Sequence, residues 1–188
     1  MKPHHFLPVF IALIASYIGL HFYAARWLAR SFTLSHSAAA WLRAALLLAA
    51  FFAPFTMFLK RQYHSPALEP VYTAGYAWMG VILVAAFVFA CSDLASLALR
   101  RLPGLISPRQ LTQLTLAILF LVLARAFYGG FKTPPVKEVL LPFKNLPPAL
   151  EGFKIAQISD MHLDSDWKLR QFAGIIEEIN SARPDLVL

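Results

Sequence analysis

Cysteine and charged residues are scarce in this chain of 188 residues. The single cysteine, Cys91, excludes a disulfide within the chain and a zinc site built from several cysteines. Charged residues make up 14% of the chain, well below the roughly 25% of soluble domains. Hydrophobic residues take their place at 59%. This composition excludes a disordered chain, a disulfide-stapled mini-protein and a charged coiled coil.

Acidic residues are almost absent from the first 137 residues, which contain only Glu69 and Asp93 against twelve Lys and Arg. The remaining residues carry eight acids and five basic residues. The basic residues of the first part lie between apolar runs, as the flanking charges of membrane helices do. No basic stripe with interleaved aromatic residues occurs in a soluble segment, so no nucleic-acid partner is expected.

Four apolar runs predict transmembrane helices at about residues 6–25, 38–59, 71–92 and 111–127. Each run reaches the roughly 17–25 residues that a helix needs to cross the hydrocarbon core. Short links predict antiparallel neighbours in a helical membrane domain over residues 1–130, with the lipid bilayer as partner. An integral membrane protein is therefore expected. A cleaved signal peptide is the alternative for the first run, but its length and the later runs favour a retained helix.

Several residues within the runs have expected roles in the membrane. Arg43 and Asp93 lie near the same end of the second and third runs, so they could pair, or each could extend separately to the interface. Pro54 predicts a kink in the second helix. Aromatic residues near the ends of the runs are expected to be interface anchors, namely Trp27, Trp41, Tyr72 and Tyr128.

The composition of the sequence changes after residue 130. A proline-rich linker over 131–152 includes an expected short edge strand at 136–141. Residues 153–159 then predict a strand, 167–181 an amphipathic helix, and 185–188 a second apolar strand. This order predicts a βαβ unit with parallel strands, as at the beginning of an α/β domain.

Two candidate metal ligands, Asp160 and His162, follow the first of these strands. If the chain stays extended there, both side chains point to the same side, where a carboxylate and an imidazole can bind one divalent metal. The carboxyl ends of strands are also where open α/β sheets bind ligands. The alternative is a polar turn in which His162 is solvated.

The strand at 153–159, the motif Ser159-Asp160-Met161-His162-Leu163, the helix and the run 183–188 together resemble the calcineurin-like metallophosphoesterase family. They are most similar to its bacterial branch with N-terminal transmembrane helices, which implies a location in the bacterial cytoplasmic membrane. The resemblance covers about residues 136–188 and implies that 153–188 begin a four-layer α/β metallophosphoesterase domain.

The same resemblance implies that Asp160 and His162 bind one ion of a two-metal centre, with Mn, Fe or Zn as the cofactor. The family's bridging aspartate and later histidines would follow Leu188, so the 188 residues are expected to be an inactive N-terminal fragment that binds metal weakly. Asp185 is expected to be a loop or structural residue and not a metal ligand.

The implied function is a membrane-anchored phosphoesterase that hydrolyses phosphate-ester or pyrophosphate bonds. A phospholipid or a lipid-linked precursor, such as a lipid A intermediate, is the expected substrate class, because a site tethered at the bilayer meets such molecules. The alternative is a non-enzymatic four-helix membrane sensor or assembly protein with a degenerate C-terminal domain.

Overall fold

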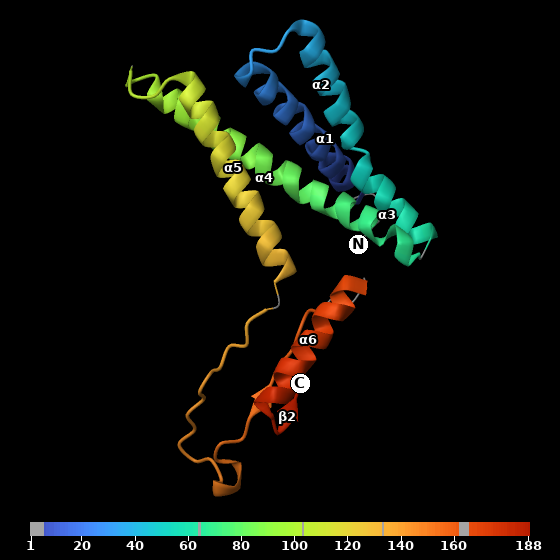
Figure 1. The fold of residues 1–188 in the computed structure, drawn as a ribbon, viewed down its shortest axis with the longest axis vertical. Coiled ribbons are helices and arrows are strands. Elements are labelled where there is room, and N and C mark those ends of the chain that lie inside the picture. The colour runs from blue at the N-terminus through green and yellow to red at the C-terminus, as the bar shows by residue number, and fades with distance from the viewer. Residues whose placement is uncertain (1–5, 64, 103, 133, 162–165) are drawn as a thin grey trace. The chain divides into compact units, whose positions relative to one another are not determined.

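A computed structural model describes residues 6–63, 65–102, 104–132, 134–161 and 166–188. They divide into two compact units, Met1–Tyr128 and Gly129–Leu188. The first unit is helical and Figure 1 shows its elements in chain order. They are α1 (Phe6–Ser31), α2 (His36–Ala49), α3 (Phe52–Gln62), the short 3-10 turn η2 (Pro66–Leu68), α4 (Glu69–Leu99) and α5 (Pro108–Phe131), the last of which ends just inside the second unit.

Among the described residues, four helical stretches are long and apolar enough to cross a membrane, which confirms the predicted number and order of spans. They cover Leu7–Ser31, His36–Gln62, Pro66–Leu99 and Pro108–Phe131. At most 22% of the most apolar window of any stretch is buried inside the protein. Most of their apolar surface therefore faces outwards, as is typical of a membrane-interacting surface.

The second span is broken between α2 and α3, next to Pro54. Proline has no N–H, so the carbonyl of Ala50 lacks its usual donor four residues later. The turn tightens instead, and Phe51 N donates to the Leu48 carbonyl at 3.0 Å. The predicted kink is confirmed.

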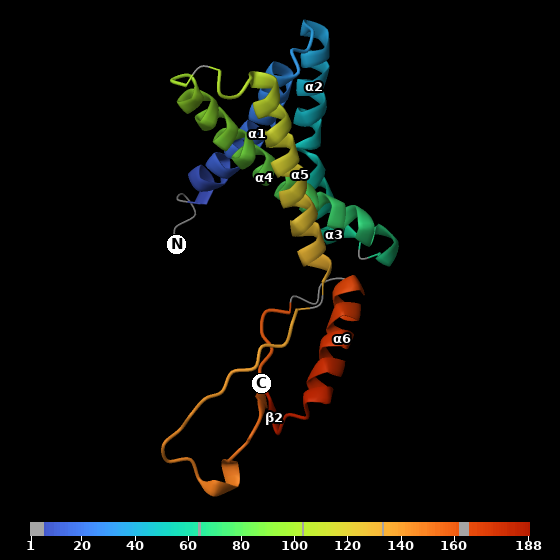
Figure 2. The same ribbon diagram turned by 60° about the vertical axis from the view of Figure 1, so that its left-hand side comes forward.

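The core of the first unit lies between α1 and α4, which cross in the view of Figure 2. Trp27 stacks on Phe89 with ring centroids 4.0 Å apart and an interplanar angle of 2°. The small side chains of Ala24 and Ala85 complete the contact and let the two backbones approach closely. Trp27 is only 2% exposed, so its predicted role as an interface anchor is wrong.

Helices α3 and α4 form a second close contact. Tyr72, near the start of α4, donates its hydroxyl to the Tyr63 carbonyl at 2.6 Å and is 1% exposed. Its predicted role as an interface anchor is therefore also wrong, because this hydrogen bond holds the ring inside the helical pair. Trp41 and Tyr128 are exposed, as interface anchors would be.

The second unit contains β1 (Ile155–Ala156), α6 (Asp166–Ala182) and β2 (Leu186–Val187), after a 3-10 turn η3 (Pro148–Leu150). The strands are parallel, with Ile155 opposite Leu186 and Ala156 opposite Val187. The predicted βαβ order and strand direction are confirmed. Ile179 is the buried apolar residue of α6.

The edge strand predicted at 136–141 is wrong, since these residues have no regular structure. Val139, Leu140 and Leu141 are largely exposed, with Leu140 at 96%. A strand needs a partner to satisfy its backbone groups, and among the described residues the sheet consists of β1 and β2 alone. The alternation of side chains was therefore not sufficient to form a strand.

Candidate functional site

The carboxyl ends of β1 and β2 lie side by side, and the candidate metal ligand Asp160 follows this edge. The ladder extends beyond the two strands, because Leu188 N donates to the Ala156 carbonyl and Ile158 N donates to the Leu188 carbonyl, both at 2.8 Å. Asp160 comes two residues after the last of these bonds. The edge thus brings the end of the second strand close to the residue that the sequence singles out.

Asp160 leaves the strand in a left-handed backbone conformation, with φ at 58°. The prediction that Asp160 and His162 share one side rested on an extended chain, and at Asp160 that premise is wrong. Among the described residues, the hydrogen bonds of the ladder reach Ile158, two residues before Asp160. Aspartate tolerates this turn better than most residues, because its short polar side chain can bond locally. His162 lies outside the described residues.

The chemistry of this edge suits a divalent cation. Asp160 is exposed, and its carboxylate is a hard oxygen donor. With the imidazole of His162, the donor set fits ions such as Mn or Zn. Left-handed conformations of residues other than glycine cost energy and cluster at functional sites. Among the described residues, no group of three His, Cys, Asp or Glu is placed to hold a metal ion.

Asp185 lies at the opposite end of the sheet and has a structural contact. Its carboxylate accepts a hydrogen bond from the backbone N of Lys154 at 2.8 Å, just before β1. The Asp185 backbone N in turn donates to the Lys154 carbonyl at 2.8 Å. These bonds join the starts of the two strands, which supports the expected structural role of Asp185.

The helical unit contains an ion pair that sequence reasoning missed. Asp93 on α4 pairs with Arg30 on α1, and it also accepts a hydrogen bond from the Tyr23 hydroxyl at 2.9 Å. The first span was predicted to end at about residue 25, whereas α1 continues to Ser31. Tyr23 and Arg30 are seven residues apart, which places both on one face of that helix. This spacing is the feature of the sequence from which their shared partner could have been predicted.

Arg43 takes no part in this pair. Its Nε donates to the Ala39 carbonyl at 3.0 Å, one turn earlier in α2. The proposed pairing of Arg43 with Asp93 is therefore wrong. Asp93 has its partner on a neighbouring helix instead, and the alternative, in which each residue extends separately to the interface, stays a prediction.

A second polar cluster surrounds His21, which is fully buried between α1 and α4. Its Nδ1 lies 2.9 Å from the Tyr17 carbonyl, and its Nε2 lies 3.0 Å from Trp78 Nε1. Trp78 can only donate, so Nε2 accepts and Nδ1 carries the proton. Both ring nitrogens are thus occupied, and the neutral ring has no lone pair for a metal. The nearby Tyr17 hydroxyl is buried with no hydrogen-bond partner among the described residues.

Removal of the Trp78 N–H and removal of the Tyr17 hydroxyl should have opposite effects on stability. Trp78→Phe leaves the His21 acceptor unpaired and should cost about 1–2 kcal/mol of unfolding free energy. Tyr17→Phe removes a buried hydroxyl that has no partner among the described residues, so stability should stay equal or rise. Thermal unfolding in detergent measures both.

A His21→Leu variant provides the control for the ring area that Trp78→Phe removes. There, Trp78→Phe should cost less than in the unaltered chain, because the acceptor is gone. Equal losses in the two backgrounds, or a Tyr17→Phe variant as unstable as Trp78→Phe, would contradict this account of the cluster.

Comparisons with protein-family models, with curated proteins and with solved structures find no match for this chain.

Proposed function

We propose that this chain is the N-terminal part of a membrane-anchored, metal-dependent phosphoesterase of the calcineurin-like metallophosphoesterase type. The observation that carries the proposal is the parallel β1–α6–β2 unit with Asp160 at the carboxyl end of β1. Ligands in open α/β sheets bind at this edge. The left-handed backbone of Asp160 adds support, because a residue that departs from ordinary backbone geometry is a common mark of a functional site.

Asp160 and His162 would hold the first metal ion. A bound pair of divalent ions supplies polarisation of the phosphate group and a lower pKa for a bound water molecule. The negative charge of Asp160 suits a cation, and the residue is exposed. The end of the second strand lies close to this part of the chain, because Leu188 is hydrogen-bonded to Ile158. Further ligands would be needed to complete a two-metal centre.

The substrate class follows from the apolar helices. Four stretches able to cross a membrane belong to the same chain as Asp160, so the proposed site acts close to lipid. A phosphate ester or pyrophosphate carried by a lipid is therefore the favoured substrate over a freely diffusing one. The shared chemistry is a phosphorus–oxygen bond cleaved by water.

The proposal is tested with the longer protein, purified in detergent and assayed for release of phosphate or of an alcohol from phosphate esters. We expect turnover with Mn²⁺, its loss after EDTA treatment, and its return when Mn²⁺ is added back. Lipid-linked and short-chain water-soluble esters, assayed side by side, test the substrate class. Turnover that EDTA leaves unchanged would contradict metal dependence. No turnover with any ester and metal would favour the non-enzymatic sensor or assembly protein instead.

A further inference from the structure

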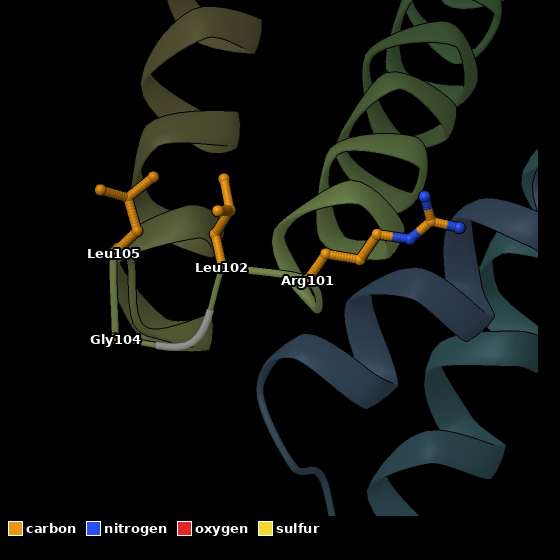
Figure 3. A pocket seen from close by; sticks show the side chains of 4 residues that line it. All are labelled: Arg101, Leu102, Gly104 and Leu105. Atoms are coloured by element: carbon orange, nitrogen blue, oxygen red, sulfur yellow. The ribbon is translucent and has the colours of Figure 1, made fainter.

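The connection between α4 and α5 combines exposed arginines with exposed apolar side chains. Leu102, Leu105 and Ile106 are 58%, 64% and 38% exposed. Arg100 and Arg101 precede them and are exposed, and the chain turns at Gly104 with φ at 90°. A shallow depression of about 460 Å³ is lined by Arg101, Leu102, Gly104 and Leu105. Figure 3 shows the Arg101 side chain extending away from the two leucines.

This connection belongs to an end of the helical unit that is rich in arginine. We call it the arginine end, defined by Arg26, Arg30, Arg100, Arg101 and Arg109. The ion pair of Arg30 with Asp93 joins the C-terminal parts of α1 and α4 at this end. Among the described residues, no acidic partner lies within ion-pair distance of the other four arginines. All four are exposed.

The opposite end of the helices carries fewer exposed arginines, namely Arg61 and Arg125. There, Lys60 lies over the rings of Tyr72 and Tyr76, with its Nζ 6.0 and 5.8 Å from the two centroids. Glu69 also begins α4 at that end and offsets part of the positive charge. The arginine end therefore has more guanidinium groups left for an external anion.

The exposed guanidinium groups and the exposed apolar side chains beside them together indicate which anion binds. Guanidinium binds phosphate through paired hydrogen bonds, and a cluster of unpaired arginines repels itself unless anions neutralise it. Exposed leucine and isoleucine are unfavourable in water but favourable at the boundary between lipid head groups and acyl chains. One partner satisfies both requirements, namely an anionic phospholipid.

We propose that the arginine end is a docking surface for anionic phospholipids. Arg100, Arg101 and Arg109 contact the lipid phosphates. Leu102, Leu105 and Ile106 lie at the acyl boundary. The surface is continuous with the ends of the membrane-spanning stretches, where lipid head groups are the nearest neighbours. This inference does not depend on the proposed enzymatic function.

The test measures lipid retained by the purified 188-residue chain in detergent, by native mass spectrometry, after mixing with phosphatidylglycerol or with phosphatidylcholine of the same acyl chains. We expect at least about tenfold stronger retention of phosphatidylglycerol, which the triple variant Arg100→Gln/Arg101→Gln/Arg109→Gln should abolish. The matched control, Arg61→Gln/Arg125→Gln/Lys132→Gln, removes the same charge from the other end of the helices and should retain the lipid.

Two further arms identify the source of the binding. Leu102→Ser/Leu105→Ser/Ile106→Ser should weaken phosphatidylglycerol retention several-fold without a change of charge, and inorganic phosphate should compete poorly. Thermal unfolding confirms that each variant is folded. Equal retention of the two lipids, equal loss in the arginine and control variants, or full competition by inorganic phosphate would each overturn the proposal.

Discussion

Replacement of Asp160 with asparagine is expected to lower Mn²⁺-dependent phosphoesterase turnover of the longer protein by at least about a hundredfold, or roughly 2.7 kcal/mol of barrier. Asparagine keeps the shape of the side chain but removes the negative charge that would bind the ion. It also tolerates the left-handed backbone at φ of 58°. The variant therefore separates the loss of a ligand from a change in the chain's path. An initial-rate assay against Mn²⁺ concentration measures the effect.

Glu177→Gln is the matched control for this substitution. Glu177 is an exposed acidic residue of α6, so its replacement removes one carboxylate from the same unit. Turnover of this variant should match that of the unaltered protein. Unchanged turnover in Asp160→Asn, or equal losses in the two variants, would remove Asp160 from the metal site.

Gly75→Ala is expected to destabilise the helical unit by about 1–3 kcal/mol, through overpacking between α3 and α4. A Cβ at this position would clash with the Thr56 hydroxyl and lie 2.8 Å from Thr56 Cβ and 2.9 Å from Cγ2. Thr56 cannot move aside easily, because it is fully buried and its hydroxyl donates to the Ala53 carbonyl at 2.9 Å. The two helices must therefore separate. A lower unfolding temperature in detergent would report the loss.

Gly80→Ala provides the control in the same helix. A Cβ at Gly80 would meet no atom within 4 Å, so this variant should be as stable as the unaltered protein or slightly more so. The pair Gly75→Ala/Thr56→Gly should recover part of the lost stability, since it moves the methyl group to the other helix. A Gly75→Ala variant as stable as Gly80→Ala would show that α3 and α4 are not in close contact.

The four helical stretches were predictable because the requirement for them is local. A run of about 20 apolar residues is sufficient to span a membrane, whatever its neighbours are. The ends of the helices were less predictable, since α1 continues to Ser31 and α4 to Leu99, beyond the apolar runs. Polar and charged residues can extend a helix past the apolar core when a neighbouring helix or water satisfies them. This error concealed Arg30, and with it the ion pair to Asp93.

The βαβ unit was predictable for a similar reason. Alternation of period two and an apolar spacing of three and four residues identify strand and helix from short windows. The strand expected at 136–141 has the same alternation and does not form. β1 differs from this segment because it pairs with β2, and such pairing cannot be predicted from a short stretch of sequence. At the candidate site, the alternation of side chains predicted the strand before Asp160. It did not predict the left-handed backbone of Asp160 itself.

The sequence by itself determined that this protein has a basic, apolar helical part and an acidic αβ part, because composition and periodicity act through water, lipid and the local backbone. Only the tertiary structure decided the partners of Asp93, His21 and Gly75, and the burial of Trp27 and Tyr72. These depend on the rotation and closeness of helices that are distant in the chain. A side chain's type limits its possible partners, but only packing brings one of them within reach.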